Sequence, residues 1–125
     1  MTTHLAIRLP YDKPPLTLNG RYHWRKRAAV SKDLREHIAR EVWGKTWPTT
    51  CEHIRVELHY HPRDARRRDA DNLVPTLKPC IDGIVDSGLI PDDTPEYVTW
   101  TAPVIHEPDG QGPRLTLHIY LGQTA

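Results

Sequence analysis

Four stretches of the chain alternate apolar and polar residues, which is the pattern of a β-strand with one buried face. They are residues 4–9, 51–61, 97–102 and 114–121. The second stretch alternates most regularly, with Ile54, Val56, Leu58 and Tyr60 on one side and Arg55, Glu57, His59 and His61 on the other. Because the loop "HEPDGQGP" lies between the last two stretches, we predict that they pair as a hairpin.

Two further stretches carry apolar residues at helical spacing. Ser31 is a suitable N-cap for a helix that reaches residues 42–45, and the apolar stripe of this helix is Leu34, Ile38 and Val42. The second stretch has apolar positions at Leu73, Leu77, Cys80, Ile81, Ile84 and Val85. These patterns predict two amphipathic helices.

The ends of the second helix carry their own signals. Asn72 is a plausible N-cap, and Ser87-Gly88 is typical of a helix end. Pro75 suits a first turn, whereas Pro79 removes a backbone hydrogen bond further inside. We therefore expect a kink or an irregular first turn.

The resulting order, β-α-β-α-β-β, predicts an α+β fold with a mixed sheet and with the helices packed on one face. A chain of 125 residues is the length of one domain, so we take 1–125 as a single domain. No apolar run approaches the roughly 20 residues that span a bilayer, and no secretory signal is visible. Cys51 and Cys80 lack the spacing of a disulfide scaffold. We expect reduced thiols, a cytoplasmic protein and no membrane partner.

The charges are segregated along the chain, although the net charge is only +1. One basic cluster is Arg21, Arg25, Lys26 and Arg27, and a second is Arg63, Arg66, Arg67 and Arg68. Residues 10–30 interleave aromatic side chains with the first cluster, which predicts an ordered loop. Segregated cations suit a polyanion bound to one face. Each cluster taken alone also fits ordinary solvated surface charge.

The stretch "RRRDADN" places two carboxylates directly after the arginine run. In an extended segment the side chains of Asp69 and Asp71 point to the same side, and carboxylate oxygens suit Mg²⁺ or Mn²⁺. Asp92-Asp93, after the second helix, would bring a third carboxylate to the same point. The neighbouring guanidinium groups would oppose the repulsion between the acids and bind phosphate.

Lys78 follows Asp71 by seven positions, about two helical turns, so both residues can share one helix face. Lys78 would then contact a scissile phosphate or a leaving oxygen. The alternative is a simple helix-surface ion pair with Asp82 at i+4.

These motifs together resemble the RusA-type Holliday-junction resolvases. "RRRDADNL…LKPCIDGIVDSGLIPDD" is similar to the family's D-x-D-N-L, lysine, helix and D-D, and "LPYDKPPLTLNGRYHWRKR" is similar to its proline-rich Asn-Arg-Tyr segment. The resemblance implies a homodimeric, Mg²⁺-dependent endonuclease that resolves four-way DNA junctions by paired symmetric nicks.

The resemblance also implies roles for single residues. The metal ligands would be Asp69, Asp71 and Asp93, or Asp92 in place of Asp93. Lys78 would be an essential basic residue, and Arg68 and Asn72 would support the site. In many members the lysine follows the second aspartate by four positions, where this chain has Pro75. The DNA backbone would be held by Arg21, Arg25, Lys26, Arg27, Arg66, Arg67 and Arg68.

Three alternatives remain open at this stage. The chain can be a catalytically silent protein that binds branched DNA, or a nuclease for a broader set of flaps and branches. His59 and His61 at i, i+2 could also chelate zinc, although no cysteine or acid nearby has the spacing of a further ligand. The nuclease prediction depends on one geometric expectation, that Asp69, Asp71 and Asp93 meet in a single pocket.

Overall fold

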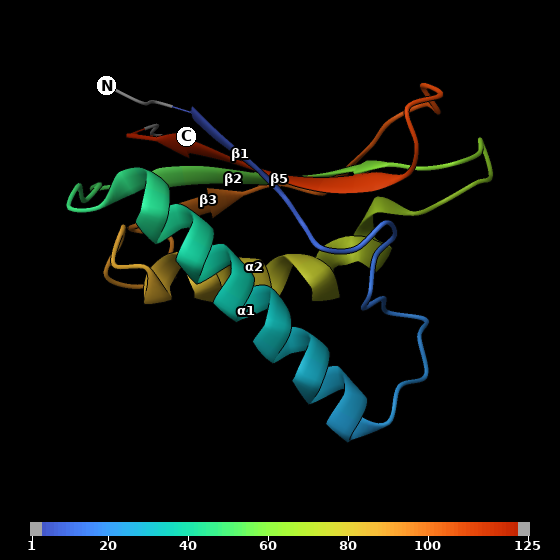
Figure 1. Ribbon diagram of the computed structural model, residues 1–125, viewed down its shortest axis with the longest axis horizontal. Helices are drawn as coiled ribbons and strands as arrows, with labels where there is room; N and C mark the ends of the chain where they lie inside the picture. Colours follow the sequence, from blue (N-terminus) through green and yellow to red (C-terminus); the bar gives the residue numbers. More distant parts are fainter. Residues whose placement is uncertain (1–3, 123–125) are drawn as a thin grey trace.

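The computed structural model describes residues 4–122 as one mixed sheet with two helices on the same face (Figure 1). The elements in chain order are β1 (His4–Arg8), α1 (Trp24–Thr46), β2 (Ile54–His61), the 3₁₀ helix η1 (Ala70–Leu73), α2 (Val74–Asp86), β3 (Val98–Trp100), β4 (Val104–Ile105) and β5 (Arg114–Leu121). The α+β class and the mixed sheet are confirmed. Within residues 4–122, no helix is long and apolar enough to cross a membrane.

The strands lie in the order β1-β5-β2-β3, and β4 follows β3 along the same edge of β2. β5 pairs antiparallel with both β1 and β2, whereas β3 and β4 run parallel to β2. The predicted hairpin of the last two strands is therefore wrong, because β3 and β5 lie on opposite edges of β2. The chain changes edge through residues 106–113, where Gly110 and Gly112 take positive φ angles of 76° and 90° that favour glycine.

The sheet contributes every second side chain of its central strands to the hydrophobic core. The predicted inward positions of β2 are all buried, and so are the alternate positions of β5, from Leu115 to Leu121. The stripe of α1, which is Leu34, Ile38 and Val42, packs against them. α1 begins at Trp24 rather than at the predicted Ser31. Its first turns contain no buried residue, so no apolar stripe marks them in the sequence.

α2 lies close to α1 at a single small residue. A Cβ added at Gly83 would meet the carbonyl oxygen of Arg35 at 2.5 Å and the Cβ of Ile38 at 2.9 Å. Arg35 also donates two hydrogen bonds to the carboxylate of Asp86 across the same contact. These contacts fix how the two helices cross.

The start of α2 differs from the prediction in one respect. The N-cap is Leu73 and not Asn72, because the turn Ala70–Leu73 is a 3₁₀ helix that leads directly into Val74. The irregular turn, η1, lies before α2, whereas Pro79 lies inside α2. The predicted end of the helix is confirmed, with Ser87 as the C-cap and Gly88 at a φ of 86°.

Candidate functional site

Asp69 and Asp71 lie where β2 has ended and α2 is about to begin. Asp69 has an extended backbone and caps η1, and Asp71 stands in the first turn of η1. Both side chains are exposed and line one pocket of about 260 Å³. The other residues of this pocket, called the acidic pocket below, are Leu18, Asn19, Ala70 and Asn72. The two carboxylates therefore line one pocket, which is consistent with the prediction that they share a site.

The wall of the acidic pocket is an N-terminal loop that is tied to η1 and α2. Oδ1 of Asn72 accepts a hydrogen bond from the backbone N–H of Asn19 at 3.1 Å. Oγ1 of the buried Thr76 accepts from the N–H of Leu16 at 3.3 Å and donates to its carbonyl oxygen at 2.7 Å. No local pattern singles out Thr76 or Asn19, because their partners lie far away in the chain.

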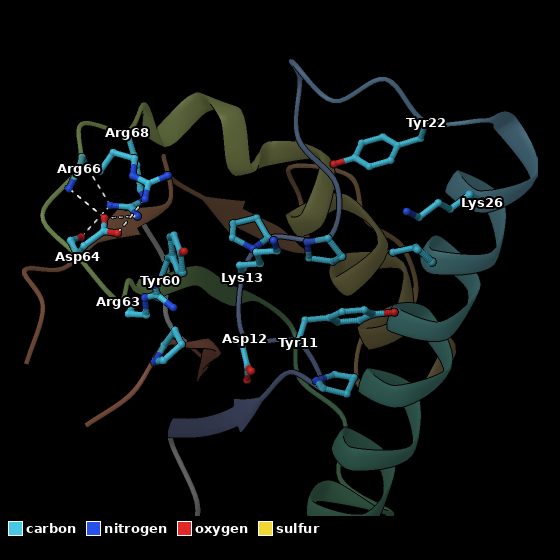
Figure 2. A pocket seen from close by; sticks show the side chains of 15 residues that line it. Tyr11, Asp12, Lys13, Tyr22, Lys26, Tyr60, Arg63, Asp64, Arg66 and Arg68 are labelled. Atoms are coloured by element: carbon cyan, nitrogen blue, oxygen red, sulfur yellow. Dashed lines mark hydrogen bonds and ion pairs between the residues drawn. The ribbon is translucent and has the colours of Figure 1, made fainter. Parts of the chain in front are cut away.

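Two residues of the arginine run form ion pairs with Asp64, a carboxylate outside the predicted site. Arg68 and Arg66 bind Asp64 at 2.9 Å and 3.0 Å, as Figure 2 shows. Hydrogen bonds from Arg68 and from the backbone of Arg66 lower the pKa of Asp64. Arg66 and Arg68 thus pair with Asp64 and form no ion pair with Asp69 or Asp71 in the described residues. They shape the loop 63–68 through Asp64 instead.

Asp92 and Asp93 lie at the other end of α2. β3 runs parallel to β2 with Ile54 opposite Val98, so the segment before β3 lies near the start of β2, whereas Asp69 follows its end. The 13-residue α2 alone spans about 20 Å between them (Figure 1). In residues 4–122, no three histidine, cysteine, aspartate or glutamate side chains are placed to hold one metal ion. The expectation that one chain joins Asp93 to Asp69 and Asp71 is therefore wrong.

Lys78 is exposed on α2 and does not line the acidic pocket. Its Nζ lies 5.7 Å from the ring centroid of Trp100, at the end of β3. Within the described part of the chain, Lys78 forms no ion pair with Asp82. The expected ion pair with Asp82 is therefore not formed, and Lys78 lies beside an aromatic ring instead.

The first basic cluster lies at the N-terminus of α1. His23 caps the helix by accepting the N–H of Arg25, and the first turn contains no acid. Arg25 lies over the ring of Trp24, while Lys26 and Arg27 lie near the ring of Tyr22. Cations at this end oppose the helix dipole, each at a cost of about 0.3–1 kcal/mol. Their placement therefore does not serve the stability of the helix.

A cluster of histidines lies on the face of the sheet that carries no helix, and its members are His4, His59, His61, His106 and His118. His59 contacts Glu57 at 3.0 Å and His106 at 2.7 Å, and the rings of His61 and His106 stack at 4.1 Å. Burial, and then the neighbouring His59 and His4, lower the pKa of His118 to about 4. The cluster is held by stacking and hydrogen bonds between its rings.

Neither a scan against models of protein families nor a search of curated proteins returns a match for this chain. The resemblance to RusA-type resolvases therefore stays a prediction from the motifs. The geometry of Asp69, Asp71 and the surrounding cations carries the functional argument.

Proposed function

We propose that this protein is a metal-dependent endonuclease that cuts branched DNA, four-way junctions above all, as a homodimer. The observation that carries the proposal is that Asp69 and Asp71 line one solvent-open pocket next to the arginine loop. Proteins hold Mg²⁺ through one or two carboxylates together with water and substrate phosphate. The donor set of the acidic pocket fits that cation, and Mn²⁺ has similar preferences.

The cationic surface supports a phosphate-bearing substrate. Arg21, Arg25, Lys26 and Arg27 form no ion pair with any carboxylate in residues 4–122. Their positions at the start of α1 are unfavourable for the helix and favourable for an anion. Arg67 is likewise exposed and lacks an ion pair there. These groups would hold the backbone without reading the bases.

The nuclease prediction required Asp69, Asp71 and Asp93 to share one pocket, and a single chain does not meet that requirement. A homodimer is proposed because the partner subunit can supply Asp93 instead. A four-way junction has approximate two-fold symmetry, which a C2 dimer matches with two sites. A two-fold arrangement that sets the two α2 helices antiparallel would bring the partner subunit's Asp93 toward Asp69 and Asp71. Each site would then contain carboxylates from both copies.

When bound there, a divalent cation would supply Lewis-acid chemistry to the hydrolysis of a phosphodiester bond. The contribution of the chain is positional. Asp69 and Asp71 would hold the cation beside the scissile phosphate, and Arg67 would neutralise charge on the neighbouring phosphates. The two cysteines are unpaired, which supports a reducing, cytoplasmic setting.

Nicking of a synthetic four-way junction with Mg²⁺ and with EDTA tests the proposal. Asp71→Asn should abolish Mg²⁺-dependent nicking, while junction binding survives. Asp82→Asn is the matched control, because Asp82 lies two turns into α2, away from the acidic pocket, and should leave nicking unchanged. Full activity of Asp71→Asn would exclude the metal role. A comparison of junction, fork, flap and linear duplex would distinguish a resolvase from a broader nuclease.

A second candidate is a branched-DNA-binding protein without catalysis. It is favoured by the finding that one chain joins only two of the three expected acids. Tight junction binding without any nicking in Mg²⁺ or Mn²⁺, at protein concentrations where the dimer is shown to exist, would select this candidate.

A further inference from the structure

A pocket of about 930 Å³ lies beside the arginine loop. Its walls come from the loop after β1, the first turns of α1, the end of β2 and residues 63–68. Figure 2 shows Tyr22 and Lys26 on one side, the Asp64 loop on the other, and Tyr11, Asp12 and Lys13 between them. No local pattern in the sequence indicates that these four segments line one pocket.

The charge of this pocket is strongly positive. Five cations line it against two carboxylates, and these are Lys13, Lys26, Arg63, Arg66 and Arg68 against Asp12 and Asp64. Asp64 is already bound by Arg66 and Arg68. The other three cations are exposed and form no ion pair with any described carboxylate. The hollow therefore attracts an anion that reaches several cations at once.

Tyrosine rings are interleaved with these cations. The ring of Tyr22 lies on the backbone of Gly20, where an added Cβ would stand 2.1 Å from Cε2 of the ring. Tyr11 is fixed by a hydrogen bond from its hydroxyl to Asp33 at 2.8 Å. Burial, and then this bond, raise the pKa of Tyr11 to about 12, so the hydroxyl remains a donor. The rings are held in place before any ligand arrives.

The pocket continues to the acidic pocket through a third one of about 400 Å³. This connecting pocket shares Lys13, Pro14, Tyr60, Arg66 and Arg68 with the large pocket. It shares Asn19, Asp69 and Asn72 with the acidic pocket. The three pockets therefore form one cleft that leads from the tyrosines to the two carboxylates.

We propose that this cleft binds an unpaired DNA strand, with its bases against the tyrosines and its phosphates against the cations. Grooves for single strands combine a cationic track with aromatic rings, because every unpaired base offers a face for stacking. The bases of a duplex are already stacked and cannot use such rings. The binding of an unpaired strand is argued from the lining of the cleft alone. The choice of DNA over RNA, and the delivery of a phosphate to Asp69 and Asp71, rest on the proposed function.

Fluorescence anisotropy with the full chain in EDTA tests the cleft. The probes are a labelled oligothymidylate of about 12 nucleotides, its duplex, the matching oligoribonucleotide and polyglutamate. The chain should bind the oligothymidylate about 10-fold tighter than the duplex or polyglutamate. The double variant Lys13→Ala/Arg63→Ala should weaken oligothymidylate binding about 10-fold and reduce its salt slope by about 1.4, at about 0.7 per lost contact.

Two controls distinguish binding in the cleft from nonspecific electrostatic attraction to the protein surface. Lys32→Ala/Arg40→Ala removes the same charge from exposed positions further along α1 and should change single-strand binding less than about 2-fold. Tyr22→Ala should weaken it about 10-fold while Tyr22→Phe retains it, because the phenyl face suffices for stacking. An equal loss from both double variants, or equal binding of duplex, polyglutamate or RNA, would overturn the proposal.

Failure of the cleft and failure of the nuclease give different results. If Asp71→Asn still nicks junctions, the nuclease site is wrong, and the anisotropy results stand independently. If Asp71→Asn is inactive but the cleft variants bind the oligothymidylate normally, only the cleft proposal falls.

Discussion

Oδ1 of Asn72 accepts a hydrogen bond from the backbone N–H of Asn19 at 3.1 Å, which joins the N-terminal loop to the turn that carries Asp71. One helical turn later, Thr76 binds both backbone groups of Leu16. The residue types of η1 and α2 thus hold a loop that is more than fifty positions away in the chain.

The first prediction concerns this attachment. Thr76→Val removes both hydrogen bonds and leaves the amide and carbonyl of Leu16 buried without partners, so the free energy of unfolding should fall by about 1–3 kcal/mol. Denaturant titration measures the change. Thr76→Ser keeps the hydroxyl and should cost less than half as much. A Thr76→Val protein as stable as the wild type would show that the hydroxyl does not hold the N-terminal loop.

The second prediction separates sites built within one chain from sites built between two chains. Asp71→Asn and Asp93→Asn proteins should each lack Mg²⁺-dependent nicking. When they are mixed and exchanged, the hybrid dimer has one site with both changes and one site with neither, so about a quarter of wild-type nicking should return. Gel assays of junction cleavage measure this recovery. No recovery, despite subunit exchange shown by mass spectrometry, would mean that the partner does not supply Asp93.

The third prediction tests the contact between α1 and α2. Gly83→Ala places a methyl group 2.5 Å from the carbonyl oxygen of Arg35, so the helices must move apart at a cost of about 1–3 kcal/mol. Gly44, inside α1, has nothing within 4 Å of an added Cβ. Gly44→Ala should therefore stabilise by about 0.5–1 kcal/mol. Thermal unfolding of both variants checks the opposite signs, and a stable Gly83→Ala protein would contradict the tight crossing.

The fourth prediction concerns the stability of the fold at low pH. His118 titrates near 6.5 when unfolded and at about 4 when folded, so the unfolded state binds more protons between these values. Stability should therefore be complete above about pH 6.5 and fall as the pH drops toward 4. Burial also lowers the pKa values of His61 and His106, which adds to the same trend.

For His118 alone the loss should be on the order of 1 kcal/mol, once solvent screening of a partly exposed ring is allowed for. Chemical denaturation at a series of pH values measures it, and His118→Asn should flatten the curve between pH 6.5 and 4. The groups that face His118, which are His4, His59, Glu57 and His106, remain in that variant. An unchanged curve would mean that His118 does not contribute to the acid sensitivity.

Elements with a buried apolar stripe could be predicted from local patterns in the sequence. The faces of β2 and the apolar positions of α2 follow directly from side-chain alternation and helical spacing. The first turns of α1 could not be found this way, because they bury nothing. Their helical state follows from the helix-forming residues Arg25 to Ala29 and the His23 cap, which are weaker signals.

The strand order and the position of Asp93 could not be read from local patterns. Alternation tells which residues of β3 and β5 face the core, but it does not tell which edge of β2 each strand joins. A short loop favours a hairpin, yet β5 pairs along all of β2 and leaves the other edge to β3 and β4. That choice decides where Asp93 lies, and it is a long-range property of the sheet.

Because β3 runs parallel to β2, a newly synthesised chain holds its carboxylates as two separate halves, one at each end of a helix. Under the proposed arrangement, a single chain cannot complete a metal site, so it cannot cut DNA until it dimerises with a second copy. Cutting would then rise with the square of protein abundance at low expression and vanish on dilution. The parallel direction of β3 would thus keep this nuclease from cutting an intact genome when few copies are present per cell, because cutting requires two of them.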